Sequence, residues 1–290
     1  MGGENRQLNG HNLIHPAHGF SAVTNTSFGF TQGLGLDLYQ GNDVISGAPV
    51  VAHLLTYGQK LFGQVSFLNR IGLDLSVGGV AAVGGDLQAI LTRGALAGLD
   101  FEGMPKVRLF TLDEIGFQLT GGVGVRYSRY LSITPGVVVQ RALQDPASLA
   151  NVQAIQDAML QQVDALTIVP AVMLAEGVSA LGIQLSAGPA FSAYGSNRSH
   201  GVRFGAHAAL DLRNFSPVVP VALTAEYALD YAFGSGREGE PGATAEADHT
   251  VVGGLFYTGR RDLELGATFT ANPKPNELLL LASMDMHYYF

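Results

Sequence analysis

The sequence contains no cysteine and no tryptophan, and only 14% of its residues are charged, below the roughly 25% usual in soluble domains. The absence of cysteine excludes disulfides, thiol nucleophiles and thiolate metal sites. Basic residues are also scarce, because 16 Lys and Arg stand against 24 Asp and Glu. The resulting formal charge of −8 argues against a nucleic-acid-binding protein, which would carry a basic face.

Long hydrophobic runs are missing as well. A transmembrane helix needs about 20 mainly apolar residues, and the best candidate is the uncharged stretch 177–197. Gly182, Gly188 and Pro189 interrupt this stretch, and its apolar residues recur at every second position, which is the pattern of a strand hairpin. The start of the chain, residues 1–6, has neither the basic nor the apolar region of a secretory signal.

What the sequence does contain is alternation with a period of two, as in strands whose two faces differ. Apolar side chains occupy alternate positions near the C-terminus: Leu263, Leu265, Ala267, Phe269 and Ala271. The opposite face carries Asp262, Glu264, Thr268 and Thr270. Similar runs of roughly 10–14 residues recur along the chain, and a tilted strand needs about 9–11 residues to cross a bilayer. Because a membrane strand cannot leave an unpaired edge in lipid, these runs predict a closed barrel.

We therefore predict an all-β fold, a transmembrane antiparallel up-and-down β-barrel of about 12 strands over residues 27–290. The strands are expected at 27–39, 50–66, 71–83, 116–128, 130–142, 166–178, 181–194, 200–213, 219–233, 249–259, 262–273 and 277–290. An additional hairpin within 96–115 would raise the count to about fourteen. Residues 1–26 are polar and are expected to form a separate N-terminal periplasmic segment.

The lengths of the connecting segments fit this arrangement. Short links are expected on one side of the membrane, at 68–70, 128–129, 179–180, 214–217 and 259–261. Longer segments are expected on the other side, at 40–49, 84–115, 143–165 and 234–248. Short turns are typical of the periplasmic side of bacterial barrels, and long loops are typical of the outer side.

Two helices are expected within the long outer segments. Asp145 and Pro146 suit the N-cap and first position of a helix that continues to about Asp164, with apolar residues at steps of three or four. A shorter helix is expected from Asp86 to Arg93 and should end at Gly94.

The C-terminal residues Met284-Asp285-Met286-His287-Tyr288-Tyr289-Phe290 alternate and end on an aromatic residue. Together with the alternation elsewhere, this ending resembles that of Gram-negative outer-membrane β-barrel proteins of the porin-like family, over about residues 20–290. In that family the barrel-assembly machinery reads the ending, so the resemblance implies that Tyr288 and Phe290 form an assembly signal. It also implies a multi-pass barrel in the outer membrane, with lipid around it, periplasmic termini and a signal peptide removed during export.

Polar residues behind the apolar stripe are expected to face the lumen of the barrel. The principal set is Arg126, Arg203, His207, Asp211, Arg213, Glu226, Asp230, Glu264 and Asp285. Further members are Asp37, Lys60, Asp74, Gln118, Gln140, Gln184 and His287. Such a lumen predicts a pore or passive transport route for small polar solutes, with its charges setting selectivity. The alternative is that these charges pair and fill the interior, which would leave a largely closed barrel acting as a structural or scaffold component of an envelope complex with protein partners.

Catalytic and metal-binding patterns are weak. An outer-membrane lipid-modifying hydrolase would need a serine beside a base, and His207 and Asp211 lie about 13 Å apart along one strand face. The sequence has no Gly-x-Ser-x-Gly and no His-Glu-x-x-His motif, and the acidic segment 234–248 lacks the spacing of a calcium loop. We therefore predict a non-enzyme without cofactor or metal and without nucleic-acid partners.

Overall fold

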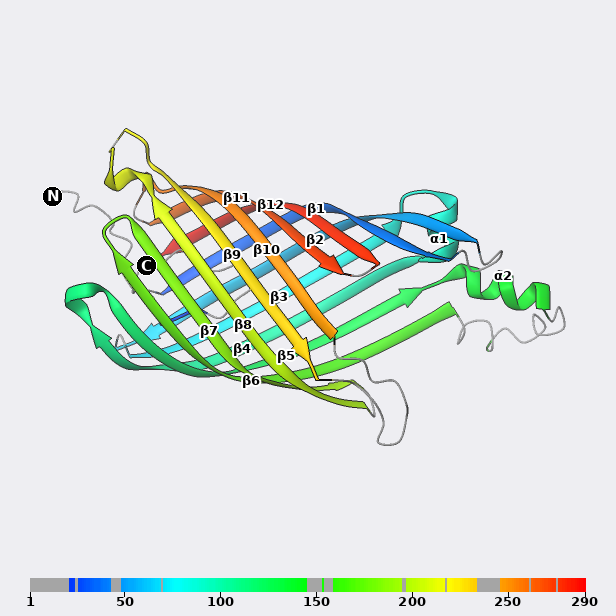
Figure 1. Ribbon diagram of the computed structural model, residues 1–290, viewed down its shortest axis with the longest axis horizontal. Coiled ribbons are helices and arrows are strands. Elements are labelled where there is room, and N and C mark those ends of the chain that lie inside the picture. Colours follow the sequence, from blue (N-terminus) through cyan, green and yellow to red (C-terminus); the bar gives the residue numbers. More distant parts are fainter. Residues whose placement is uncertain are drawn as a thin grey trace.

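The computed structural model describes residues 21–23, 26–42, 48–68, 70–144, 153, 159–194, 197–216, 218–233, 246–260, 262–274 and 276–290. Twelve antiparallel strands in these ranges form one closed barrel, so the predicted fold class and strand number are confirmed. The strands are β1 (Ser27–Asn42), β2 (Pro49–Phe67), β3 (Ile71–Gly84), β4 (Ala95–Leu112), β5 (Phe117–Ile133), β6 (Leu160–Val178), β7 (Leu181–Tyr194), β8 (Asn197–Asp211), β9 (Val221–Ala232), β10 (Glu246–Tyr257), β11 (Leu263–Lys274) and β12 (Glu277–Tyr289). Each strand pairs with the next along the chain, and β1 pairs with β12 to close the barrel (Figure 1).

The period of two separates an apolar outer face from a more polar inner face. On β11, Leu265 and Phe269 point outward and are 45% and 54% exposed, whereas Glu264 and Thr268 between them are buried. A soluble protein buries its large apolar side chains, so this barrel has the opposite arrangement. The outer surface is that of a barrel surrounded by lipid. Within the described residues, no helix is long and apolar enough to cross a membrane.

The two ends of the barrel differ in their connections. One end carries the C-terminus and the turns that join β2 to β3, β4 to β5, β6 to β7, β8 to β9 and β10 to β11, and we call it the turn end (Figure 1). In the turn between β10 and β11, Arg260 Nη2 lies 2.7 Å from Asp262 Oδ2. The hydrogen bonds that Arg260 donates to Asp262 lower the pKa of the Asp262 carboxyl. The opposite end carries helices α1 (Leu87–Thr92) and α2 (Pro135–Gln144), and we call it the helix end.

Two predictions in the first half of the chain were wrong, and their effects on the number of strands cancel. The segment 84–115 contains β4 and is not simply a loop, and the predicted strand 130–142 is absent because β5 continues through the predicted turn 128–129. Pro135 explains the second error. Proline has no N–H for a strand ladder and fits the first turn of a helix, so α2 begins there. The strand number therefore remains twelve, and the additional hairpin of the fourteen-strand alternative is not observed.

The expectations for the helices had different outcomes. Helix α1 is confirmed, because the Asp86 side chain accepts a hydrogen bond from the Ala89 N–H at 2.7 Å and Gly94 follows with φ of 72°. Most of the second predicted helix, 145–152 and 154–158, lies outside the described residues. Its predicted end at 160–164 was wrong, because β6 begins at Leu160.

The N-terminal segment 1–26 is described only at its end. Ser21, Ala22 and Val23 lie inside the barrel near the turn end and are 0–1% exposed. The preceding residues and most of the predicted acidic loop 234–248 lie outside the described residues.

Candidate functional site in the barrel lumen

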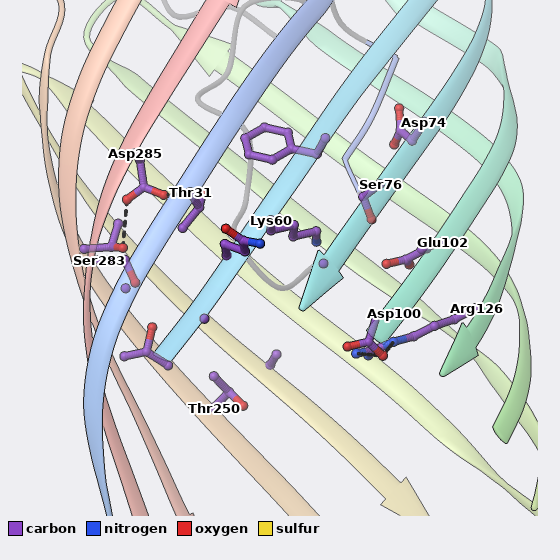
Figure 2. Close-up of a pocket in the computed structure, with 18 of the residues that line it drawn as sticks. Thr31, Lys60, Asp74, Ser76, Asp100, Glu102, Arg126, Thr250, Ser283 and Asp285 are labelled. Atoms are coloured by element: carbon purple, nitrogen blue, oxygen red, sulfur yellow. Dashed lines mark hydrogen bonds and ion pairs between the residues drawn. The ribbon is translucent and has the colours of Figure 1, made fainter. Parts of the chain in front are cut away.

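A cavity of about 350 Å³ lies within the barrel (Figure 2). Every strand except β6 contributes to its lining, so the wall surrounds it on almost all sides. Its charged residues are five carboxylates and three permanent cations: Asp74, Asp100, Glu102, Asp230, Asp285, Lys60, Arg126 and Arg203. Apolar side chains, including Phe62, Met104 and Phe256, contribute as well. The cavity therefore has charged groups set in a wall whose exposed surface is mostly apolar.

The wall formed by β4 and β5 holds a fixed ion pair. Arg126 donates to Asp100 Oδ1 from Nη2 at 3.0 Å and from Nε at 3.2 Å. The same carboxylate oxygen accepts hydrogen bonds from Ser128 Oγ at 2.5 Å and Tyr130 OH at 3.2 Å. Glu102 is the register partner of Arg126 across β4 and β5 and also lines the cavity. Several partners thus hold the guanidinium and carboxylate in place at the cavity surface.

Another ion pair lies on β8 and β9, where Arg203 Nη2 donates to Asp230 Oδ2 at 3.0 Å. Lys60 is on β2, six strands from β8 in either direction around the barrel, and therefore on the opposite wall. Among the described residues, Lys60 has no hydrogen-bond or ion-pair partner. Figure 2 shows its side chain projecting into the interior. This ammonium group is consequently available to a solute or to water.

The carboxylate of Asp285 on β12 is held by neighbouring hydroxyls. Thr31 Oγ1 donates to Asp285 Oδ1 at 2.6 Å, and Thr268 Oγ1 donates to Oδ2 at 2.9 Å. The hydroxyls come from β1 and β11, the two strands that flank β12. These two hydrogen bonds fix the position of the Asp285 carboxyl group at the cavity surface.

Inward glycines make room for the cavity. Gly33 and Gly58 lie opposite each other on β1 and β2, and Gly78 lines the cavity from β3. A Cβ atom added at Gly58 would meet only the Gly79 carbonyl oxygen, at 3.9 Å. Space at this level therefore depends on missing side chains and would accept a larger residue.

The nine principal residues predicted for the lumen occupy two regions. Arg126, Arg203, Asp230 and Asp285 line the cavity. The other strand residues lie closer to the turn end and are buried: His207, Asp211, Glu226 and Glu264. Arg213 lies beyond β8 in the short helical turn Leu212–Asn214, and its Nη1 donates to the Thr258 carbonyl at 2.9 Å. One further member was wrong, because Gln140 lies in α2 and not on a strand.

The buried residues near the turn end are held by side chains from neighbouring strands. Tyr289 OH donates to Glu264 Oε2 at 2.7 Å, and Thr258 Oγ1 donates to Asp211 Oδ1 at 3.1 Å. His207 lies opposite Gln184 on β7 and Glu226 on β9, so neither register partner is a serine. The described residues contain no group of three His, Asp or Glu side chains arranged to hold a metal ion. The register partners of His207 are therefore an amide and a carboxyl group.

Sequence reasoning missed four charged residues of the inner wall: Asp100, Glu102, Lys106 and Arg108. All four are on β4, in a segment that was predicted to be a loop. The signal was present, because Leu99, Phe101 and Val107 alternate with the charged positions. Gly103 and Pro105 interrupt that apolar face and conceal the pattern.

The C-terminal aromatic residues lie on the outer face. Tyr288 and Phe290 are 40% and 78% exposed, and their rings meet edge to face with centroids 5.0 Å apart. The Phe290 N–H donates to the Thr26 carbonyl at 3.0 Å, which fixes the end of the chain beside the start of β1. Their side chains are therefore accessible from outside the barrel.

Solved structures with a similar fold are outer-membrane β-barrels. The COG4313 outer membrane channel from Pseudomonas putida F1 has a TM-score of 0.59 at 9% identity, over 96% of this chain and 100% of that chain. The transport unit of the autotransporter AIDA-I from Escherichia coli has a TM-score of 0.53 at 7% identity, over 96% and 93%. The NanC porin has a TM-score of 0.52 at 8% identity, over 90% and 100%. This chain thus has the fold of outer-membrane β-barrel channels, porins and translocator domains.

No protein-family model matches the sequence, and no curated protein matches it.

Proposed function

We propose that this protein is an outer-membrane pore that gives small polar solutes a passive route through its barrel. The observation that carries the proposal is the cavity of about 350 Å³ inside the barrel, with charged groups on facing walls. A solute that leaves water loses its hydration, and charged or hydrogen-bonding side chains along the path replace part of it. Lys60 on one wall and Arg203 with Asp230 on the opposite wall are placed for this role.

The fold comparison supports the proposal at a coarser level. Two of the three similar structures are described as a channel and a porin, and the third as a transport unit. None of them is described as an enzyme. The scaffold alternative has no support from them, and the ion pairs of this barrel leave a cavity instead of filling it.

The proposed orientation places the turn end and the C-terminus in the periplasm and the helix end outside the cell. Short turns at one end and longer helix-bearing connections at the other support this assignment. We further propose that Tyr288 and Phe290, which are exposed on the outer face, are read by the barrel-assembly machinery before lipid surrounds them.

The direct test is reconstitution of the purified protein. In a planar bilayer it should produce stepwise current increases, and liposomes that contain it should swell in small sugars but not in large ones. Failure of both assays, with correct insertion shown by heat-modifiable migration on gels, would contradict the pore.

A further inference from the structure

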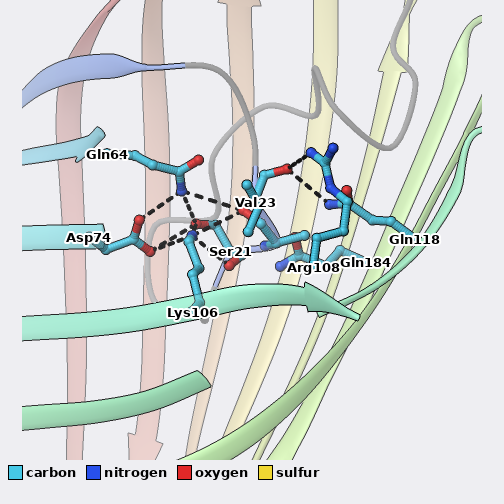
Figure 3. A network of polar contacts seen from close by, with 9 residues as sticks. Ser21, Val23, Gln64, Asp74, Lys106, Arg108, Gln118 and Gln184 are labelled. Atoms are coloured by element: carbon cyan, nitrogen blue, oxygen red, sulfur yellow. Dashed lines mark hydrogen bonds and ion pairs between the residues drawn. The ribbon is translucent and has the colours of Figure 1, made fainter. Parts of the chain in front are cut away.

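Residues Ser21, Ala22 and Val23 cross the inside of the barrel near the turn end (Figure 3). The Ala22 N–H donates to Gln184 Oε1 on β7 at 2.9 Å, and the Ala22 carbonyl accepts from Gln64 Nε2 on β2 at 3.4 Å. In a closed barrel of twelve strands, β2 and β7 are five strands apart and lie on nearly opposite walls. Hydrogen bonds of Ala22 therefore connect nearly opposite walls of the lumen at this level.

The barrel supplies every carbonyl of this segment with a hydrogen-bond donor. All three carbonyls are occupied: Lys106 Nζ donates to the Ser21 carbonyl at 2.8 Å and to the Ala22 carbonyl at 3.0 Å, and Arg108 Nη2 donates to the Val23 carbonyl at 2.7 Å. Buried backbone groups are costly without partners, so these donors are what allow the segment to lie in the interior.

The side chain of Ser21 has its own contacts. Its hydroxyl accepts from Lys106 Nζ at 2.8 Å and from Gln64 Nε2 at 3.2 Å, and it donates to Asp74 Oδ2 at 3.1 Å. Ala22 packs against Ala175 of β6, with both side chains fully buried. The space accepts a small hydroxyl residue followed by an alanine, so the contacts have some sequence preference.

The buried side chain of Lys106 depends on the segment for most of its hydrogen bonds. Its side chain is 0% exposed, and its only ionic partner is Asp74, at 2.7 Å, among the described residues. Two of its remaining contacts are carbonyls of residues 21 and 22. If the segment left, a fully buried ammonium would lose three of its four hydrogen bonds unless water replaced them. Release of the segment therefore requires water to reach Lys106.

We propose that the inner wall near the turn end is a binding site for the chain's own residues 21–23, and that occupation of this site closes that end of the lumen. The site consists of Gln64, Asp74, Lys106, Arg108, Gln118 and Gln184, on six inner-wall positions from β2 to β7. Its ligand is an extended peptide backbone with a serine hydroxyl, recognised by donors that reach its carbonyls. Closure rests on the proposed pore function, whereas occupation of the site does not.

A disulfide across the site tests occupation and closure together. The protein has no cysteine, so Ala22→Cys with Ala175→Cys introduces the only two thiols. Oxidation should join them, which thiol labelling and digestion with mass spectrometry detect. The matched control is Ala22→Cys with Ala187→Cys, because Ala187 is exposed on the outer face of β7 and should remain unjoined.

The same proteins are then measured in planar bilayers. The oxidised Ala22–Ala175 variant should lose the large conductance steps, reduction should restore them, and a variant without residues 1–23 should show larger steps than the unmodified protein. The milder variant Ser21→Ala, which loses only the hydroxyl, should open more often.

The possible results separate the two proposals. Failure of the Ala22 and Ala175 thiols to join would overturn occupation of the site. A joined variant that conducts like the unmodified protein would overturn closure while leaving the pore intact. Absence of current in every form, including the variant without residues 1–23, would overturn the pore and closure, while the disulfide would still report on occupation.

Discussion

Arg126 and Arg129 lie three residues apart on β5 but face opposite sides of the barrel wall. Arg126 faces the cavity and pairs with Asp100 on β4, with Nη2 and Oδ1 3.0 Å apart. Arg129 faces outward and pairs with Asp164 on β6, with Nε and Oδ1 2.7 Å apart. The two residues are chemically identical and have equivalent ion pairs, so they provide a matched comparison of the lumen and the outer surface.

The first prediction follows from this pair. Arg126→Gln should change the single-channel conductance and ion preference, because it removes a positive charge from the cavity surface and leaves Asp100 unpaired. Arg129→Gln should leave both properties unchanged. Planar-bilayer recordings in a salt gradient measure both, and equal effects of the two substitutions would place the ion path somewhere other than the lumen.

The second prediction concerns charge selectivity. Carboxylates outnumber permanent cations in the cavity lining, so small cations should permeate more readily than anions. Lys60→Gln should strengthen this preference, and Glu102→Gln should weaken it or reverse it. The reversal potential under a potassium chloride gradient gives the preference directly. Shifts of the same sign in both variants would be inconsistent with selection by these charges.

A third prediction uses the space beside Gly58. Gly58→Leu should lower the conductance, because its side chain would project into the cavity without a close contact to the backbone. Gly253→Leu is the control, since Gly253 is exposed on β10 and has no atom within 4 Å of an added Cβ. Stability in urea should be similar for both variants. A cavity that does not carry the solute would give unchanged conductance in Gly58→Leu.

The fourth prediction tests the two faces of the wall by stability. Val77 and Ser76 are neighbours at the middle of β3; Val77 is 38% exposed on the outer face, and Ser76 lines the cavity opposite Glu102. Val77→Arg should lower the free energy of unfolding by roughly 2–4 kcal/mol, because it places a charge in lipid. Ser76→Arg should cost clearly less, since Glu102 is available as a partner. Refolding titrations in lipid vesicles supply the comparison, and equal losses would mean that Val77 does not face lipid.

Much of the barrel could be predicted because β11 and the second half of β12 alternate between apolar and polar residues. In such a run, every second residue lies on the same face of the wall. The pattern failed where other requirements compete with it. In 130–142 the valines at 137–139 suggested a strand, but Pro135 has no N–H for the ladder and starts a helix. On β4, Gly103 and Pro105 replace apolar residues on the outer face, so a genuine strand was read as a loop.

The lumen was less predictable than the fold. Alternation indicated that Arg126, Arg203, Asp230 and Asp285 point inward. It could not show which side chains meet, because that depends on the register between the strands. The same limit applies to the binding of residues 21–23. Its hydrogen-bond partners come from strands between β2 and β7, and only the register of a closed barrel brings them around one short segment.

The most direct test of a solute path through the lumen is to block it from inside. In this cysteine-free chain, Ser76→Cys places one thiol at the cavity surface and Val77→Cys places one on the outer face of the same strand. Addition of a bulky, charged, water-soluble thiol reagent to single channels should reduce the current through Ser76→Cys in irreversible steps and leave Val77→Cys unaffected. Unchanged current in Ser76→Cys, with labelling shown by mass spectrometry, would contradict conduction through the barrel interior.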